Sequence, residues 1–320
     1  MDELIVGKLA IKEDVVWKFK VLIQFILAYM PYGERLNFML QEASRSRSPE
    51  RLRQRIRELV IELAFLQQQF DLKGKTVVEV GTGWDAINTV LLALFGARPI
   101  YSYDHVRHLR FLSIRNVLTE LNSMISELAD ASYLPETTLR RRLDVLLDSR
   151  DLSTLLEAAG ITYVAPGDAC ATGLPDHTVD LFYSYAVLEH VSEKVVHCLC
   201  QEAKRVLKSD GRVFHFIGEH DHYISVSPSL SKVNFLKYPE WLWRLLVKNK
   251  ISYHNRLRER EFLEIFAAHG SRVESIDSFV DDRDLASLRM MKVDKRFAGM
   301  SNRELAVHAT RVLLSFYRHS

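Results

Sequence analysis

A short apolar run that ends in glycines constrains the fold of this chain more than any other feature. Residues 76–80 are apolar and rich in β-branched side chains, as expected of a strand that is buried on both faces. Gly81 and Gly83 follow at once, and residues 86–95 have the composition of an apolar helix. Glycines at such a junction let the backbone turn sharply and approach a ligand. The segment predicts a strand, a ligand-binding turn and a helix in succession.

The same alternation of strand and helix continues along the chain. Each further strand is short and apolar, and most are separated by helical patterns, which favours a parallel sheet with right-handed crossovers. The sequence therefore predicts an α/β fold with a doubly wound, Rossmann-like sheet. The further expected strands are residues 99–103, 161–165, 179–185, 211–217, 272–279 and 309–317.

The chain divides into a helical start and a larger α/β domain. We expect residues 1–70 to form an N-terminal helical cap and residues 71–320 the main domain. Residues 21–30 are the most apolar window, but ten residues are too few to cross a bilayer, so a buried helix is expected. Insertions at about 130–160, 221–257 and 282–305 interrupt the alternation of strands and helices in the main domain.

Composition limits the possible partners and compartment. The net charge is +2, which is too small to indicate a nucleic-acid binder, and no RNA-binding module is recognisable. Arginines are concentrated in residues 45–57. They can form a solvated helix face or, alternatively, a contact for RNA or another anion. The three cysteines and the absence of a signal-peptide pattern favour a reducing compartment, the cytoplasm. We expect no nucleic-acid partner and no transmembrane segment, and a homodimer is one of the assemblies that the sequence allows.

Acidic residues follow the expected strands where a ligand would bind. Ligands of open α/β sheets lie beyond the carboxyl ends of the strands. Asp104 ends the second strand and can accept both hydroxyls of a ribose, and Asp168 follows the third strand. Gly81, Gly83 and Ala86 also fit the dinucleotide pattern G-x-G-x-x-A, so an NAD-dependent oxidoreductase is a real alternative.

Five motifs, taken in their order along the chain, favour another cofactor over NAD. They are the E-x-G-x-G loop at 79–83, Asp104, Asp168, the segment from Asp180 that contains Leu-Glu-His-Val at 188–191, and Leu-Lys-x-x-Gly at 207–211. In this order they resemble the class I S-adenosylmethionine-dependent methyltransferases. That resemblance implies a sheet of seven mostly parallel strands, with an antiparallel C-terminal strand inserted beside the fifth. It also implies S-adenosylmethionine as the cofactor and S-adenosylhomocysteine as its product.

The resemblance also implies roles for residues at the matching positions. The loop would hold the methionine part, Asp104 with His105 the ribose, and Asp168 with Ala169 the adenine, while Ser184 or Tyr185 would line the methionine end. The loop residues are Glu79, Gly81, Thr82 and Gly83. Asp85 stands where families with three glycines have the third, which keeps open a non-catalytic binding protein with the methyltransferase fold.

Histidines and polar residues after the fourth and fifth strands are candidates for the acceptor site. Methyl transfer is an in-line displacement that depends on positioning, and a hydroxyl acceptor also needs a base. We assign His190 and His222 as catalytic residues, with Asp221 beside His222 as a possible orienting group. The expected substrate residues are Asp221, Asn234, Asn255 and Arg256, the last together with Arg258 as a clamp for a carboxylate or phosphate.

Residues 233–238 and 253–258 extend the resemblance to bacterial methyltransferases whose acceptors are not assigned. Glu219, His220, Asp221 and His222 are metal-ligand types, but such clustering in a loop is more often incidental, so no metal is expected. No N-P-P-Y or D-P-P-Y segment follows the fourth strand, which disfavours methylation of exocyclic amines. We therefore expect methyl transfer to a polar small molecule at oxygen, such as a sugar or a lipid-linked intermediate.

Overall fold

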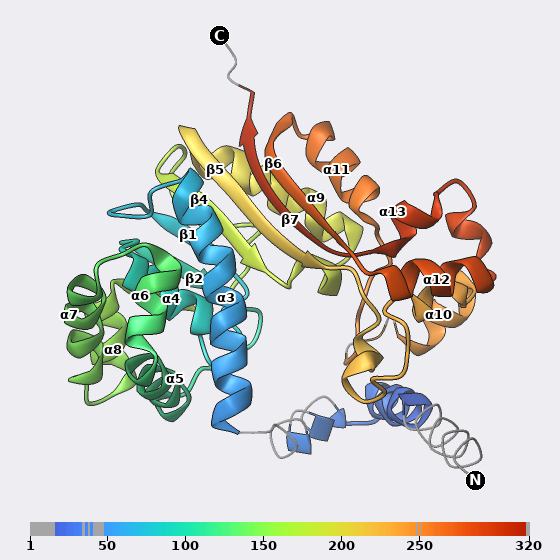
Figure 1. The fold of residues 1–320 in the computed structure, drawn as a ribbon, viewed down its shortest axis with the longest axis horizontal. Helices are drawn as coiled ribbons and strands as arrows, with labels where there is room; N and C mark the ends of the chain where they lie inside the picture. The colour runs from blue at the N-terminus through green and yellow to red at the C-terminus, as the bar shows by residue number, and fades with distance from the viewer. Residues whose placement is uncertain are drawn as a thin grey trace.

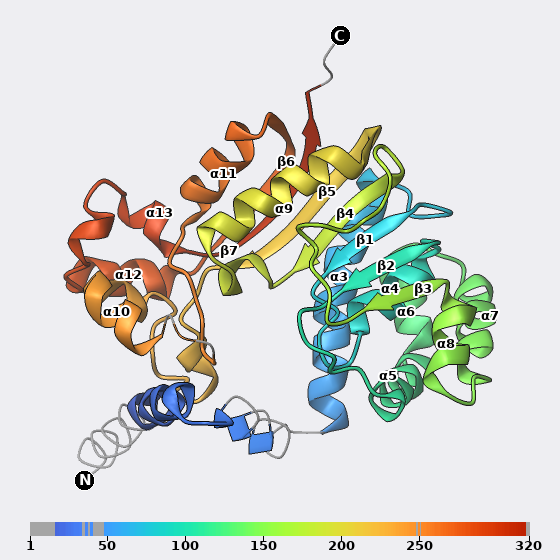
Figure 2. The same cartoon turned by 180° about the vertical axis from the view of Figure 1, so that it is seen from behind.

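Seven strands form one sheet with helices on both faces, as Figures 1 and 2 show from opposite sides. The computed structural model describes residues 17–33, 36–37, 39–40, 48–247, 249 and 251–317. The strand order is β3-β2-β1-β4-β5-β7-β6. The strands are β1 (Val77–Val80), β2 (Ile100–Tyr103), β3 (Ile161–Val164), β4 (Val179–Tyr185), β5 (Leu207–Gly218), β6 (Ser271–Val280) and β7 (Val307–Phe316).

The C-terminal strand runs against its neighbours. β1 pairs in parallel with β2 and β4, and β4 pairs in parallel with β5. β7 lies between β5 and β6 and is antiparallel to both. The structure thus confirms the expected Rossmann-like sheet and the antiparallel strand that the resemblance implied.

Six helices cover one face of the sheet. α3 begins at Pro49 after Ser48, whose hydroxyl accepts from Arg51 N. Residues 111–132 form two helices, because Met124 ends one helix and begins the next. Their apolar faces join one core with the sheet. They are α3 (Pro49–Gln69), α4 (Ile87–Phe95), α5 (Phe111–Ser123), α6 (Ile125–Ser132), α7 (Glu136–Leu147) and α8 (Leu152–Ala159).

Two helices cover the opposite face, where they close a second core. α9 (Glu193–Val206) begins at Ser192, whose hydroxyl accepts from Val195 N. α11 (Glu259–Ala268) lies beside it and packs Phe262 and Phe266 against the sheet. The sheet is therefore buried on both faces, which explains why its central strands are almost continuously apolar.

The expected insertions at 221–257 and 282–305 pack together as a lobe beside the sheet, on the right in Figure 1. We call these two segments the insertion lobe. Its core is separate from the two cores of the sheet and includes Phe235, Trp243 and Phe297. Its elements are η2 (His222–Ser225), η3 (Asn234–Lys237), α10 (Glu240–Leu246), α12 (Asp282–Met290), η4 (Lys295–Phe297) and α13 (Asn302–Ala306).

The expected N-terminal cap has two separate parts among the described residues. Helical residues 17–29 pack Trp17 and Val21 into the core of the insertion lobe, whereas α3 packs on the sheet. The buried helix expected at 21–30 is only half buried, because Leu22, Ile23 and Ile26 are about half exposed on its other side. Residues 1–16 lie outside the described part of the chain. No helix in the described part is long and apolar enough to cross a membrane.

Candidate active site

A cavity of about 570 Å³ opens at the carboxyl ends of β1, β2 and β4. This is the edge of the sheet where an open α/β fold binds its ligand. The loop after β1 forms one wall, Asp104 and His105 after β2 form another, and Tyr185 and His190 after β4 close the far side. Six of the ten expected cofactor residues and His190 thus line one cavity.

Gly81 brings the loop close to the turn after β4. Its φ of +88° lies in the region that favours glycine, and a Cβ there would lie 2.5 Å from Val187 Cγ2. Gly83 also has a positive φ, +69°, but a Cβ on it would meet no atom within 4 Å. Gly81 is therefore needed for space and conformation, and Gly83 for conformation alone.

Glu79 lies beneath the loop rather than on the wall of the cavity. Its Oε2 accepts from Thr89 Oγ1 and from Ser102 Oγ, each at 2.5 Å. Thr82 Oγ1 lies 2.6 Å from Ser102 Oγ, so one buried network supports the loop from below. Burial raises the pKa of Glu79 to about 7, although the two hydroxyl groups oppose the rise.

Asp104 is held with its carboxylate toward the loop. Oδ2 accepts from Gly83 N at 2.9 Å and Oδ1 from Val106 N at 3.2 Å. His105 Nδ1 lies 3.2 Å from the same carboxylate. Burial disfavours the charged form, but the contacts with His105, Gly83 and Val106 outweigh it and lower the pKa of Asp104. The carboxylate is therefore ionised and fixed, as recognition of a ribose requires.

In addition to Glu79, three of the expected cofactor residues do not line this cavity. Asp168 Oδ1 accepts from Cys170 N at 2.8 Å, and neither Asp168 nor Ala169 belongs to the cavity wall. Ser184 is fully buried with Oγ 2.8 Å from His215 Nδ1, whereas Tyr185 lies on the wall. Adjacent residues of a strand point to opposite faces, so of the two alternatives the structure places Tyr185 at the cavity and Ser184 inside.

Helix α3 supplies part of the site that sequence reasoning missed. Arg55, Glu58 and Leu59 line the cavity. Arg55 forms an ion pair with Asp85 at 2.9 Å. The aspartate that replaces a third glycine therefore anchors the loop to α3, and the crowded arginines of residues 51–57 were the available signal. Arg53 and Arg57 also form ion pairs, with Glu120 and Glu127, while Arg45 and Arg47 lie outside the described residues.

Histidines gather around His190, which lines the cavity after β4. The rings of His190 and His222 have centroids 4.7 Å apart, and His254 lies 4.2 Å from His222. His220 stacks on the other side of His222 at 5.0 Å. Burial, together with the neighbouring rings of His190 and His220, lowers the pKa of His222 to about 2. Sequence reasoning paired His190 with His222 but missed His254.

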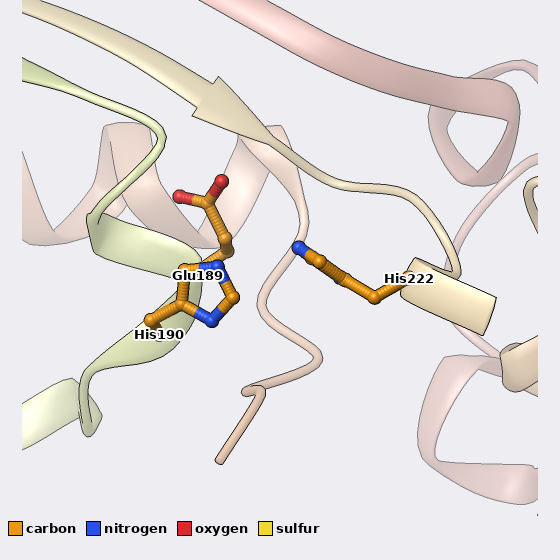
Figure 3. Close-up of side chains that lie close together, drawn as sticks. All are labelled: Glu189, His190 and His222. Atoms are coloured by element: carbon orange, nitrogen blue, oxygen red, sulfur yellow. The ribbon is translucent and has the colours of Figure 1, made fainter. Parts of the chain in front are cut away.

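Glu189 lies between these histidines and the sheet, as Figure 3 shows. It belongs to the turn η1 (Leu188–His190). Its Oε1 accepts from Gly218 N at 3.1 Å, and its Oε2 is buried without a hydrogen-bond partner among the described residues. Burial raises the pKa of Glu189 to about 8. The motif contained this residue, but its sequence context did not indicate that it faces His222.

Comparison with known proteins identifies the domain. Residues 148–215, which contain β3, β4, α9 and most of β5, match a family model described as a methyltransferase domain. This match indicates a methyltransferase domain in this part of the chain. The position of β7 between β5 and β6 is the strand arrangement that the resemblance implied.

No curated protein shows significant similarity to this methyltransferase. Solved structures with a similar arrangement include PH0226 from Pyrococcus horikoshii OT3, at 13% identity and a TM-score of 0.45, covering 82% of this chain and 91% of that one. Geranyl diphosphate C-methyltransferase from Streptomyces coelicolor A3(2) has 14% identity and a TM-score of 0.43, covering 80% of each chain. A methyltransferase from Mesorhizobium loti has 14% identity and a TM-score of 0.43, covering 80% of this chain and 97% of that one.

Two of the expected substrate residues of the methyltransferase instead hold the turn that carries His222. Asp221 does not contact the ring of His222 as an orienting group would; its carboxylate accepts from Tyr223 N at 2.9 Å and from Asn234 Nδ2 at 3.0 Å. These bonds cap η2, because an aspartate at this position satisfies the first free N–H of the turn. Asp221 and Asn234 thus hold the turn that carries His222.

The other two expected substrate residues also form hydrogen bonds inside the protein. Asn255 Nδ2 donates to Leu188 O at 2.7 Å and Val191 O at 2.8 Å, so it holds η1. Arg256 is 2% exposed and donates to Tyr238 O at 2.6 Å and to Glu240, so it braces the insertion lobe. Arg256 is therefore not available as the expected clamp, because it is buried and its Nη1 and Nη2 donate inside the protein.

The fold also uses Arg258 inside the protein, and it separates the four neighbouring residues whose side chains are of metal-ligand type. Arg258 donates to Glu219 O at 2.6 Å and lies 3.8 Å from the Glu219 carboxylate. Glu219 Oε1 also accepts from Thr310 Oγ1 at 2.6 Å. Of Glu219, His220, Asp221 and His222, only His222 joins the group in which Glu189 and His190 offer ligand atoms.

Proposed function

We propose that this methyltransferase transfers a methyl group from S-adenosylmethionine to an oxygen of a polar small molecule. The observation that carries the proposal is that His190 lines the same cavity as Gly81 and Asp104. The cofactor loop and His190 therefore face one space, in which we place a donor beside the loop and an acceptor beside His190. Three free cysteines fit a reducing compartment, and we place the protein in the cytoplasm.

The cofactor roles follow the geometry of the cavity. In this proposal the loop of Gly81, Thr82 and Gly83 holds the methionine part, and the fixed carboxylate of Asp104 binds the ribose with His105 beside it. Glu79 supports the loop through Ser102. Tyr185 lines the methionine end. Asp168 and Ala169 would reach the adenine from beyond the cavity wall.

His190 and His222 are proposed to contact the reacting oxygen. Transfer from a sulfonium requires the acceptor oxygen to lie in line with the methyl group, and the protein contributes mostly orientation. An imidazole without a proton on one nitrogen accepts a hydrogen bond from an O–H group. Two such rings at the end of the cavity would hold a hydroxyl with its lone pair toward the donor.

The alternatives find less support in the structure. An NAD-dependent oxidoreductase is disfavoured by the antiparallel β7 between β5 and β6. A non-catalytic binding protein rested on Asp85, which is explained by its ion pair with Arg55. RNA as the acceptor rested on the arginines of residues 45–57, of which Arg53, Arg55 and Arg57 already pair with acids.

Product analysis tests the proposal. The full chain is incubated with S-adenosylmethionine that carries ¹³C in its methyl group and with a small-molecule extract, and the products are examined by mass spectrometry and NMR. We expect the label in a small polar product, with a methyl shift typical of an oxygen-bound group. Label in RNA, or on nitrogen or carbon of the product, would contradict the assigned acceptor.

A further inference from the structure

Three side chains near the acceptor end of the cavity offer ligand atoms to one point. Glu189 and His190 come from the turn η1, and His222 comes from η2, beyond the end of β5. One ligand atom from each of the three lies within 4.8 Å of the other two. Figure 3 shows Glu189 and His190 on one side and His222 on the other, with a ring nitrogen of His222 pointing toward them. The fold therefore brings together groups that are separated in the sequence by more than 30 residues.

Hydrogen bonds inside the protein use only some of the polar atoms of these residues. His190 Nδ1 lies 3.2 Å from Tyr253 O, so this nitrogen can donate to the carbonyl and leave Nε2 as an acceptor. Glu189 Oε1 is used by Gly218 N, but Glu189 Oε2 and His222 Nδ1 are buried without a hydrogen-bond partner among the described residues. Buried polar atoms in native proteins are nearly always paired, so such atoms on neighbouring residues require an explanation.

We propose that Glu189, His190 and His222 bind a divalent transition-metal ion of the zinc class. Two imidazoles and one carboxylate are the protein ligands of many catalytic zinc sites, which keep a further position open. Magnesium and calcium prefer all-oxygen ligands, so the two histidines select against them. Metal–ligand bonds of about 2.0–2.2 Å would draw the three atoms closer together than they lie here.

The surroundings of the trio have the features of a metal site. A histidine ligand commonly donates its other ring N–H to a backbone carbonyl, which fixes the ring, and the contact between His190 and Tyr253 O has this form. Asn255 holds the η1 turn through Leu188 O and Val191 O. Asp221 caps the η2 turn that carries His222. Both ligand-bearing turns are thus fixed by buried hydrogen bonds.

The position of the site indicates what the ion would hold. His190 lines the cavity that contains the cofactor loop, so an ion bound to it lies at the acceptor end. The open coordination position would take an oxygen of the acceptor, and the two rings would then contact that oxygen through the ion. This second step rests on the proposed function, whereas the metal site itself does not.

Metal titration of the full chain tests the site. After treatment with a chelator, Zn²⁺ is titrated by calorimetry, Co²⁺ binding is followed by visible absorption, and Mg²⁺ is titrated as a third ion. We expect one Zn²⁺ or Co²⁺ per chain and no competition from Mg²⁺. Glu189→Gln and His222→Ala should each weaken Zn²⁺ binding by about 10–100-fold or more, since each removes a ligand.

A second histidine pair provides the matched control. His197 Nδ1 lies 2.9 Å from His269 Nε2 on α9 and the end of α11, away from the cavity. His269→Ala should leave Zn²⁺ affinity unchanged. Absence of stoichiometric binding by the wild-type chain, or binding that His269→Ala abolishes and His222→Ala does not, would overturn the proposal. The Co²⁺ spectrum of the wild-type chain remains a test if Glu189→Gln fails to fold.

Titration of S-adenosylhomocysteine in the same samples separates the two proposals. Binding of S-adenosylhomocysteine without metal binding would reject the metal site and leave the methyltransferase function intact. Metal binding without S-adenosylhomocysteine binding would reject the proposed function and retain the site as a metal centre of another reaction.

Discussion

Gly81 sets how closely the loop after β1 approaches the turn after β4. We expect Gly81→Ala to lower stability by about 1–3 kcal/mol, because φ is +88° and the new Cβ would lie 2.5 Å from Val187 Cγ2. Binding of S-adenosylhomocysteine should fall as well, since the loop would have to shift. Urea unfolding and calorimetry measure the two effects.

Two variants separate the causes of this loss. Gly83→Ala has the backbone strain without the contact, because nothing lies within 4 Å of its added Cβ, so its loss should be smaller. Val187→Ala combined with Gly81→Ala removes the contact and should recover part of the stability. Equal losses for the two glycine variants would contradict the steric role of Gly81.

Glu79 makes the stability of the protein depend on pH. Its pKa is raised by burial from the ordinary range to about 7, with Asp104 nearby as a further negative charge. Between about pH 4.5 and 7 the folded state therefore holds a proton that the unfolded state has lost. The stability contributed by that proton is present below pH 4.5 and is lost as the pH rises through 7.

Glu79→Gln removes this titration, because glutamine stays neutral at all of these pH values. We expect the melting temperature of the variant, relative to wild type, to be higher at pH 8 than at pH 5, by a few degrees. Thermal unfolding of both proteins across this range measures the difference. A difference that does not change with pH would show that Glu79 is ionised throughout.

The sequence predicted single residues well where one position decides one contact. Gly81, Gly83 and Asp104 meet in the cavity because strand ends in a parallel sheet lie at one edge. The sequence could not show whether Ser184 or Tyr185 lines the cavity. The apolar pattern of a strand that is buried on both faces does not show on which face a residue lies. Arg256 had the charge expected of a clamp, but only the fold shows its donors used by Tyr238 and Glu240.

At the scale of elements, the turn η1 depends on a residue far along the chain. Asn255 Nδ2 donates to Leu188 O and Val191 O, and Asn255 Oδ1 accepts from Leu257 N at 3.1 Å. Asn255→Ala leaves these buried groups unpaired, and we expect it to cost about 2–4 kcal/mol in the free energy of unfolding. Asn302→Ala, at an exposed position of α13, should cost less than about 0.5 kcal/mol.

Urea unfolding of both variants measures these costs. A change for Asn255→Ala as small as that for Asn302→Ala would contradict the role of Asn255 in holding η1.

The bounds of helices and strands were predicted better than the elements against which they pack. β4 begins and ends where its apolar run predicted, and Gly96 ends α4 in the left-handed conformation as expected. The place of α3 could not be predicted, because its arginines have the same pattern on a solvated face as on a wall of the cavity. Its ion pair with Asp85 joins residues that are 30 positions apart.

At the scale of the whole molecule, a buried ion pair between Glu219, just after β5, and Arg258, just before α11, lies where the sheet meets the insertion lobe. Arg258 and Glu219 are both almost fully buried, and Arg258 also donates to Leu305 O at 3.2 Å and to Val307 O. Arg258→Met leaves the Glu219 carboxylate without its counter-charge, so we expect a loss of about 3–5 kcal/mol.

A double variant tests this assignment. Arg258→Met with Glu219→Gln removes both charges and should be more stable than Arg258→Met alone in urea unfolding. Arg140→Met, which breaks the exposed ion pair with Glu136, should cost about 0.5 kcal/mol or less. Failure of Glu219→Gln to recover any stability would contradict a charge-based role for Arg258.

The sheet could be derived from the sequence, and the insertion lobe could not. Alternating apolar runs and helical periods fix the class of a parallel sheet, because the rules for crossovers allow few arrangements. The core of the lobe combines Trp17 with Phe235, Trp243 and Phe297, which come from three separate parts of the chain. No local pattern indicates which of several apolar insertions will pack together.

Ligand titration of the full chain tests the central claim most directly. Calorimetry with S-adenosylhomocysteine and, separately, with NADH compares the two cofactors that the glycine loop alone would admit. We predict that one S-adenosylhomocysteine binds per chain and that NADH gives no heat of binding. Binding of NADH together with no response to S-adenosylhomocysteine would contradict the account.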